Sequence, residues 1–312
     1  MADSIGHAPG NLSTVLVLRG AKAIGAARLA SSLVFARGVW MNVVERSGLT
    51  LDTRLVPATR GAPRPGACLY LLHRGTFVLD GAHGPHFEGP AAFLLSEQHL
   101  EGAHGVRSAT FRAYGSPFAA IEMHLAEADV LSPRAEPPTG VEVDDTGWAA
   151  IARVIGLAQE ASKDTAELEA AVGHLLGTLA ETRSIAARVA ESARSPVRFE
   201  RLWRASRPLA ERFALTATMN ELGAVDDVSP RQLDRYLQDF FATFAMVGGG
   251  WRASTVHLRI KLAVMFLSAD GVSVAEVARA VGYGSSDAMA RAFRDAGLSA
   301  PTALREALQR SA

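Results

Sequence analysis

The sequence predicts an α+β fold, in which a β-barrel or β-sandwich with flanking helices is followed by an all-α domain. The chain has 312 residues, which corresponds to two domains at about 150 residues each. Short apolar runs separated by turn residues fill the region 51–125, and apolar residues recur at helical spacing after it. We therefore expect a β-rich domain with an N-terminal helix over 1–140, a helical linker or dimerisation segment over 141–195, and a helical domain over 196–312.

The composition limits the compartment and the partners. The 32 basic and 32 acidic residues cancel, so a surface that binds nucleic acid must be local. The single cysteine, Cys68, excludes an internal disulfide and a cysteine-rich zinc finger, and this usage favours the reducing cytoplasm. The apolar stretch 31–44 is shorter than the ~20 residues that span a bilayer. We therefore expect a cytoplasmic protein without a membrane partner.

Residues 21–46 are predicted to form a helix that precedes the β-rich region. Apolar residues recur there at roughly helical spacing, although Gly25 and Gly38 weaken the pattern. The apolar stretch 31–44 belongs to this predicted soluble helix.

The β-rich region is predicted to form an antiparallel barrel or sandwich, because its apolar runs are short and bounded by Gly, Pro and Asp. Residues 79–81 and 114–117 are predicted to be hairpin turns, since their glycines accept the positive φ that such turns require. A proline-rich stretch over 131–140 ends the region. The predicted strands are 68–72, 76–79, 91–95, 110–114 and 118–124.

Two or three helices are predicted between this region and residue 193. Trp148, Ile151, Ile155 and Ala158 share one helical face, and a second apolar stripe starts at Leu168. Amphipathic helices in this position can dimerise with a second copy of the chain or pack back onto the β-rich domain. The sequence leaves both alternatives open.

The segment from Val272 to Arg305 predicts two short helices joined by a glycine-containing turn. Ser273 caps the first helix and Gly282 ends it, while Ser285 or Ser286 caps the second. Each helix has one apolar face, and the second helix carries a polar stripe opposite its own. The apolar positions are Val274, Val277, Ala278 and Val281, then Met289, Phe293 and Ala296, and the stripe consists of Asp287, Ala290, Arg291 and Arg294.

Such a helix pair suits insertion into the DNA major groove, which is ~12 Å wide and admits one helix. Small residues at the start of the second helix allow a close approach to the bases. From periodicity alone, an ordinary antiparallel helix pair with a solvated charged face explains the pattern equally well.

The string Val274-Ala-Glu-Val-Ala-Arg-Ala-Val-Gly-Tyr283, followed by Ser285 and by Arg291-Ala-Phe293-Arg294, resembles the signature of the AraC/XylS family. The signature runs across the second of the family's two helix-turn-helix units. Upstream, Arg259 to Leu267 resembles the family's linker helix. Downstream, Ser299-Ala-Pro301 and Arg305 resemble the end of the motif, with one extra residue before the proline and one fewer before Gly297. The resemblance implies a transcription regulator with two helix-turn-helix units.

The first helix-turn-helix unit is expected upstream of the linker helix, with its recognition helix over 229–240. Ser229 is a favourable N-cap, and Pro230 suits the first helical position. This half departs from the family pattern in two places, because the turn over 223–228 and the passage over 242–254 are both long.

By position in the matched motifs, the candidate base-reading residues are Arg231, Asp234 and Arg235 in the first unit and Ser286, Asp287 and Arg291 in the second. Arginine suits guanine O6 and N7, and aspartate accepts from cytosine N4. Phosphate contacts are expected from serine hydroxyls, Arg252 and Arg294. The alternative for each arginine is a solvated or ion-paired surface charge. The full DNA-binding set is Arg231, Asp234, Arg235, Gln238, Ser285, Ser286, Asp287, Arg291 and Arg294.

The β-rich region resembles the cupin-like sensor domains of such regulators in the segments Tyr70-Leu-Leu-His-Arg-Gly75 and Gly89-Pro-Ala-Ala-Phe-Leu-Leu95. The resemblance implies the fold of this region. Barrel-facing and solvent-facing positions cannot be separated without strand registers, so no effector-binding residue is identified.

Several histidines in this region invite a metal-site interpretation. A metal-binding cupin requires two histidines one residue apart on a strand, with a glutamate nearby and a later histidine. The string His83-Gly-Pro-His86-Phe-Glu88 lacks this spacing. His73 and His124 are the other histidines considered as metal ligands. We therefore expect no metal, no cofactor and no catalytic residue.

These observations predict a sequence-specific DNA-binding transcription regulator, controlled by a small-molecule effector or by assembly through its N-terminal region. The expected partners are double-stranded DNA, a second copy in a homodimer and, for an activator, RNA polymerase. Two alternatives stay open: a regulator that has lost DNA binding and acts through a protein partner, and a metal-dependent cupin enzyme fused to a DNA-binding domain.

Overall fold

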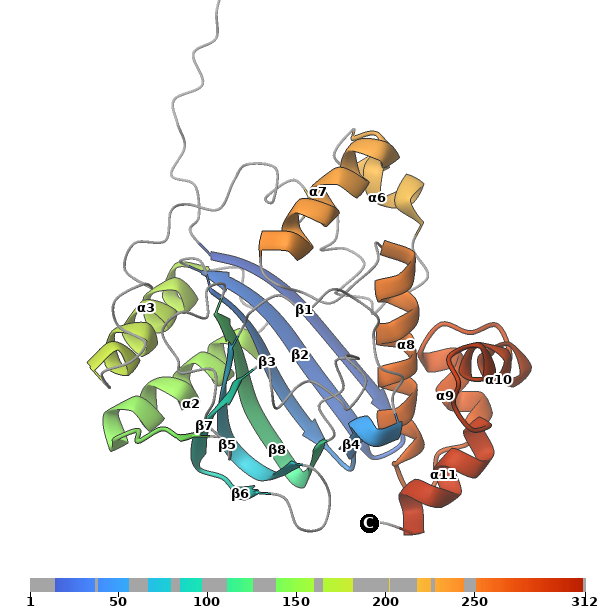
Figure 1. Ribbon diagram of the computed structural model, residues 1–312, viewed down its shortest axis with the longest axis horizontal. Helices are drawn as coiled ribbons and strands as arrows, with labels where there is room; N and C mark the ends of the chain where they lie inside the picture. The colour runs from blue at the N-terminus through green and yellow to red at the C-terminus, as the bar shows by residue number, and fades with distance from the viewer. Residues whose placement is uncertain are drawn as a thin grey trace, which may run out of the picture.

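The computed structural model describes residues 15–36, 39–55, 67–79, 85–96, 111–125, 139–159, 165–181, 202, 218–225, 228–243 and 251–310. The N-terminal part of the chain forms an antiparallel sheet. The regular elements after residue 140 are helices (Figure 1). The expected mixture of a β-rich N-terminal region and a helical C-terminal region is confirmed at this level.

The sheet has nine strands, and every pairing between them is antiparallel. Its main path runs β1-β2-β3-β8-β5-β7-β9, while β4 pairs with β8 and β6 pairs with β5. The strands are β1 (Val15–Ile24), β2 (Ala27–Ala36), β3 (Val39–Ser47), β4 (Leu51–Asp52), β5 (Ala67–Leu79), β6 (His86–Glu88), β7 (Ala91–Ser96), β8 (Phe111–Leu125) and β9 (Thr139–Gly140).

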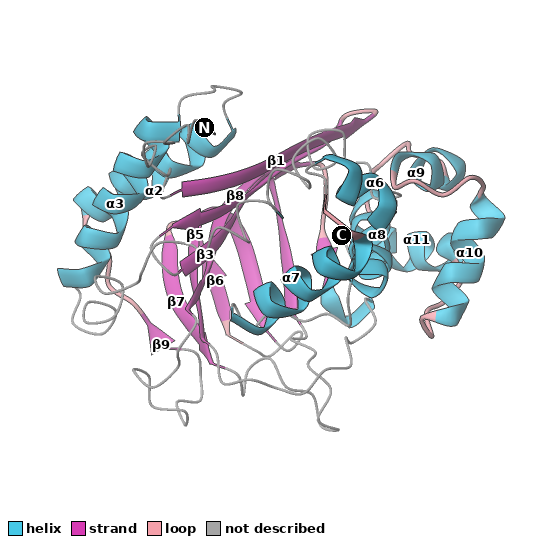
Figure 2. Cartoon of the chain, turned by 90° about the horizontal axis from the view of Figure 1, so that it is seen from above, coloured by secondary structure: helices cyan, strands magenta, loops and turns pink. Residues whose placement is uncertain are grey.

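Some of the described helices pack against a face of this sheet, and others pack against those helices. Figure 2 shows the sheet with α2 and α3 at one side and α8 to α11 at the other. The helices are α2 (Asp145–Gln159), α3 (Thr165–Glu181), α6 (Met219–Val225), α7 (Pro230–Thr243), α8 (Trp251–Leu267), α9 (Val274–Ala280), α10 (Ser286–Asp295) and α11 (Pro301–Arg310).

The helix predicted over 21–46 is wrong, because this stretch forms β1, β2 and β3. Leu29 contributes to the core on one face of the sheet and Val34 to the core on the other. The buried side of β2 therefore changes along the strand: odd-numbered residues are buried near Leu29 and even-numbered residues near Val34, so no single period of two runs through it. Gly25, with a φ of 57°, lies in a two-residue connection between β1 and β2.

The hairpin turn predicted at 79–81 falls mostly outside the described residues, whereas the one predicted at 114–117 is wrong. β5 and β6 pair as neighbours, and the Leu79 amide donates to the Pro85 carbonyl at 3.0 Å, while residues 80–84 lie outside the described ranges. Residues 114–117 stay within the single strand β8. Gly115 and Gly75 have φ of 133° and 102°, where the register between β8 and β5 shifts. Their conformational freedom therefore serves an irregular strand pair instead of a turn.

Helices α2 and α3 cover one face of the sheet. Ile151 and Val154 of α2 and Val172 and Leu175 of α3 share a core with strand residues such as Ile121. The end of α2 is fixed by Ser32, whose buried hydroxyl donates to the Ala158 carbonyl at 2.6 Å. Packing onto the sheet is therefore confirmed for these two helices, and dimerisation through them stays a prediction.

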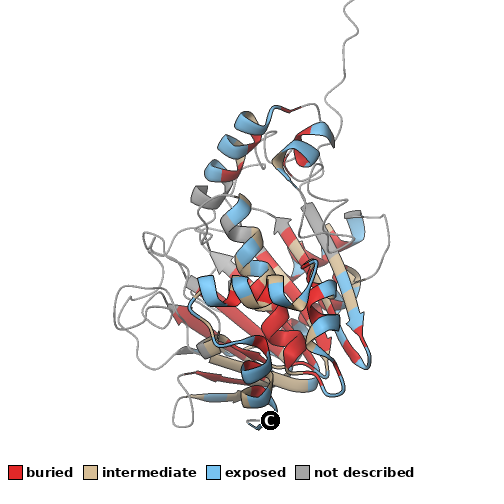
Figure 3. Ribbon diagram, turned by 90° about the vertical axis from the view of Figure 1, so that its right-hand side faces the viewer, coloured by how far each residue is buried: buried red, intermediate tan, exposed pale blue. Residues whose placement is uncertain are grey.

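The other face of the sheet shares a continuous core with α8 to α11. On the sheet side this core includes Cys68 and stacked or tilted ring pairs among Tyr70, Phe77 and Phe93. Figure 3 shows buried residues concentrated where the C-terminal helices meet the sheet. None of the helices in the described ranges has the length and apolar character needed to cross a membrane.

Replacing Gly75 by alanine is expected to destabilise the fold by about 2–4 kcal/mol, because its φ is strained for an L residue and a Cβ would lie 2.5 Å from Phe118 Cδ2. Gly156, in the exposed face of α2 with open space around it, is the matched control. Gly156→Ala should stabilise by up to about 1 kcal/mol. Urea unfolding measures both changes, and equal effects of the two variants would contradict the strain argument.

Candidate nucleic-acid interface

Helix α9 starts with a capping box. The Glu276 amide donates to Ser273 Oγ at 3.2 Å, and the Ser273 amide donates to Glu276 Oε2 at 2.8 Å. The Ser273 hydroxyl also donates to Glu276 Oε2 at 2.6 Å. This bond, followed by the one from the Ser273 amide, lowers the pKa of the Glu276 carboxyl below its ordinary value. The predicted cap at Ser273 is confirmed, and its reciprocal partner is Glu276.

The turn between α9 and α10 is short and fully defined. Gly282 has a φ of 85°, its amide donates to the Arg279 carbonyl at 3.1 Å, and the Tyr283 amide donates to the Ala278 carbonyl at 2.8 Å. Ser285 then caps α10, because its Oγ accepts from the Ala288 amide at 3.1 Å. Of the two serines considered, Ser285 is therefore the cap.

Helix α10 places its apolar residues inward and its polar stripe outward. Met289 and Phe293 are buried, whereas the stripe residues Asp287, Arg291 and Arg294 are exposed. Ser285 is also exposed, while Ser286 is half-buried. The helix lies at the outer edge of the molecule, beyond α9 as seen from the sheet (Figures 1 and 2).

Arg259 joins α8 to this turn. Its Nε donates to the Val281 carbonyl at 3.0 Å, its Nη2 donates to the Gly282 carbonyl at 2.5 Å, and its guanidinium lies 3.9 Å from the centre of the Tyr283 ring. The cation therefore binds carbonyls at the C-cap of α9 and just beyond it, close to the negative end of the helix dipole. Sequence reasoning placed Arg259 in the linker helix and missed this contact, since only the folded turn brings the carbonyls to it.

The first unit consists of α6 and α7. Thr218 and Glu221 form reciprocal hydrogen bonds at the start of α6, at 2.7 and 3.2 Å. A Cβ at Gly223 would lie 2.3 Å from the Val228 carbonyl oxygen, so the turn into α7 requires a residue without a side chain. The Thr218-x-x-Glu221 spacing is a capping-box signal that sequence reasoning overlooked.

Helix α7 has the expected faces. The Gln232 amide donates to Ser229 Oγ at 3.3 Å, which confirms the cap, and Leu233 and Leu237 are buried. The polar stripe is exposed along its whole length, and Arg252, near the start of α8, is exposed as well. The exposed stripe residues are Arg231, Asp234, Arg235 and Gln238.

The two sets of predicted DNA-binding residues lie on separate helices and do not meet. Helix α8 has 17 residues, about 26 Å of helix, with α9, α10 and α11 against it. Helix α7 lies near the opposite end of α8 from α9 to α11 (Figure 1). Helices α7 and α10 therefore expose their polar stripes near opposite ends of α8.

The histidine-rich segment does not assemble a metal site in the part of the chain that the structure describes. His86 Nε2 lies 3.6 Å from Glu88 Oε1, with both side chains exposed. His73 is half-buried on β5, and burial lowers its pKa, as does the neighbouring Arg74. His83 and the side chain of His124 lie outside the described residues.

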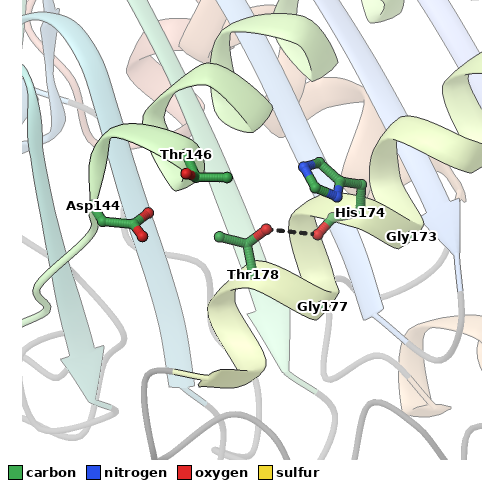
Figure 4. Close-up of a pocket in the computed structure, with 6 residues that line it drawn as sticks. All are labelled: Asp144, Thr146, Gly173, His174, Gly177 and Thr178. Carbon is green, nitrogen blue, oxygen red and sulfur yellow. Dashed lines mark hydrogen bonds between the residues drawn. The ribbon is translucent and has the colours of Figure 1, made fainter.

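A hollow of about 460 Å³ lies between the start of α2 and the middle of α3 (Figure 4). Two of its polar groups already have partners within the protein. Asp144 Oδ1 accepts from the Gly147 amide at 2.7 Å, and the Thr178 hydroxyl donates to the His174 carbonyl at 3.0 Å. The hollow therefore offers few convergent groups to a ligand, and it lies across the sheet from α10. Its lining residues are Asp144, Thr146, Gly173, His174, Gly177 and Thr178.

Comparison with protein-family models and with curated proteins gives no match. Among solved structures, ToxT from Vibrio cholerae has a TM-score of 0.33 at 8% identity, over 85% of this chain and 97% of that chain. The unsaturated fatty acid-bound wild-type ToxT has the same TM-score and identity, over 86% and 94%. The AraC-like transcriptional activator CuxR has a TM-score of 0.30 at 13% identity, over 72% and 80%. Similarity at this level identifies neither the family nor a ligand of this chain.

Replacing Arg259 by lysine should destabilise the protein by about 1–3 kcal/mol, because an ammonium group cannot bind two adjacent carbonyls and stack on Tyr283 at once. Arg279, exposed on α9, provides the control, and Arg279→Lys should change stability by less than about 0.5 kcal/mol. Chemical denaturation measures both, and similar losses in the two variants would remove the special role of Arg259.

The capping box predicts a pH dependence of stability. Because the folded-state pKa of Glu276 is lowered, its contribution is present above the unfolded value of about 4.3 and is lost as pH falls through the folded value. The stability difference between wild type and Glu276→Gln should therefore shrink under acid conditions. Unfolding measured between pH 7 and pH 3 checks this, and in a Ser273→Ala background the pH-dependent difference should be smaller. An undiminished difference at low pH would contradict the hydrogen-bonded carboxylate.

Proposed function

We propose that this chain is a sequence-specific DNA-binding transcription regulator of the AraC/XylS type. One observation carries the proposal: α9 and α10 form a capped, glycine-turned helix pair whose second helix is anchored by Met289 and Phe293 and exposes Asp287, Arg291 and Arg294. A helix supported on one side and polar on the other is what the major groove admits.

The chemistry of the exposed stripe of α10 suits base and phosphate recognition. Arg291 can donate two hydrogen bonds to guanine, and Asp287, in the first turn, can accept from cytosine. Arg294, about one turn beyond Arg291, is suited to a phosphate. The short side chains of Ser285 and Ser286 at the start of the helix leave room for the DNA. This end of the helix also carries the positive end of its dipole, which favours a phosphate nearby.

The first unit is proposed to read a second segment of the same DNA. Helix α7 exposes Arg231, Asp234, Arg235 and Gln238. Successive major-groove segments on one face of DNA lie ~34 Å apart. The length of α8, about 26 Å, with a helix pair at either end is compatible with that separation.

The sheet with α2 and α3 is proposed to be the regulatory region, with the segments 1–140, 141–195 and 196–312 as domains. Its input is a small molecule or a second copy of the chain, and its output reaches the DNA-binding part through α8, whose core is continuous with the sheet. In this proposal the protein works in the cytoplasm as a homodimer, and it contacts RNA polymerase if it is an activator.

Selection of genomic DNA fragments by the purified protein at about 150 mM salt tests the proposal, because nonspecific phosphate attraction is screened there. We expect an asymmetric motif with two boxes about one helical turn apart. A single box would show that only one unit reads bases, and the absence of any enriched motif would favour a regulator that acts through a protein partner.

Replacing Arg291 by alanine should weaken binding to the selected site by about 1–3 kcal/mol and relax the preference at one base pair. Arg153, exposed on α2 and paired with Glu167 at 3.2 Å, provides the control, since α2 lies on the far side of the sheet. Arg153→Ala should leave affinity unchanged. Equal loss on all DNA sequences would assign Arg291 to a phosphate.

A further inference from the structure

The C-terminal half of α8 is buried on every side. Seven of the eight residues from Ile260 to Leu267 are buried, the exception being the half-buried Lys261. A helix turns once every 3.6 residues, so such a run requires partners on opposite sides. Helices α9, α10 and α11 lie on one side, and β4 with the neighbouring end of β3 provides the other.

The sheet side of this helix is held by a small polar contact, which we call the docking contact and define as Arg46, Thr50, Met265 and Ser268. The Thr50 amide donates to Ser268 Oγ at 2.7 Å, and the Ser268 hydroxyl donates to the Met265 carbonyl at 2.5 Å. Ser268 therefore links the last turn of α8 to the chain between β3 and β4.

Arg46, at the end of β3, is the charged group in this contact and is 5% exposed. Its Nη2 donates to the Ala113 carbonyl at 2.6 Å, its Nη1 lies 3.6 Å from Met265 Sδ, and its guanidinium lies 3.9 Å from the centre of the Phe118 ring. Its buried Nε has no hydrogen-bond partner among the described residues. Burial lowers the pKa of Arg46 to about 10, against smaller raising effects of Tyr70 and Glu122.

A buried cation held by one carbonyl, a thioether and a ring is poorly compensated for the water it has lost. Met265 of α8 is one of the groups that cover the guanidinium, so withdrawal of the helix opens this side of Arg46 to solvent and reduces the cost. Arg46 therefore opposes the packing of apolar α8 residues at the same place.

We propose that the docking contact is a releasable joint, in which Arg46 weakens the attachment of α8 and the second helix-turn-helix unit to the sheet, while Ser268 and the apolar core maintain it. In this proposal α8 opens away from the chain between β3 and β4 while the strands at the centre of the sheet stay paired. The inference concerns the fold itself and holds whether or not the chain binds DNA.

Amide hydrogen exchange, measured by NMR on the full chain, tests this inference directly, because the Thr50 amide loses its partner when the contact opens. Arg46→Met replaces the cation by an apolar side chain of similar length. It should slow exchange at Thr50 by about tenfold, while the Leu71 amide in the centre of the sheet changes less. Arg74→Met, at an exposed arginine of β5, is the matched control and should leave Thr50 unchanged.

Ser268→Ala provides the opposite change, because it removes the acceptor of the Thr50 amide. Exchange at Thr50 should accelerate while Leu71 is unaffected, and Ser299→Ala, at an exposed serine beyond α10, should have no effect. Faster Thr50 exchange in Arg46→Met would show that the arginine supports docking and would overturn the proposal. An equal change at Thr50 and Leu71, or an unaltered Thr50 in Ser268→Ala, would overturn it as well.

Discussion

The burial of α8 between the sheet and the C-terminal helices is the constraint on which the rest of the structure depends. Apolar residues of α8 pack against the strands and against α9 to α11, so one core extends from the sheet into these helices. At the other end of α8 the first unit packs mainly within itself, through α6 and α7. Among the described residues the two units therefore differ in attachment: α9 to α11 share a core with the sheet, whereas α6 and α7 pack chiefly against each other.

The helices of the second unit were predictable in detail because their signals are local. Ser273, Gly282 and Ser285 act through hydrogen bonds and a backbone conformation that span only a few residues, and each lies where the sequence placed it. The polar stripe of α10 follows from the same periodicity. These signals do not assign a function to the exposed arginines of α10, because recognition helices and ordinary surface helices both expose arginine.

The N-terminal strands were not predictable because their sequence pattern depends on what covers the sheet. Strands β2 and β3 bury side chains on one face near one end and on the other face near the other end. No single alternation of apolar and polar residues runs through them, so the region was assigned to a helix. Gly115 was correctly expected to need a positive φ, yet a hairpin and an irregular strand pair place the same demand on the residue. Likewise, nothing near Arg46 in the sequence indicates that a helix more than two hundred positions away covers its guanidinium.

The sheet also hides the only thiol of the protein. Cys68 is 4% exposed in the core beneath α8, and its burial raises the pKa of the thiol well above the ordinary value. The thiolate that reacts with alkylating reagents is therefore scarce at neutral pH. A cysteine introduced at an exposed position of α7 or α10 will accept a fluorophore or spin label selectively, and the native residue can stay in place. The chain is thus suited to spectroscopic distance measurements between α7 and α10.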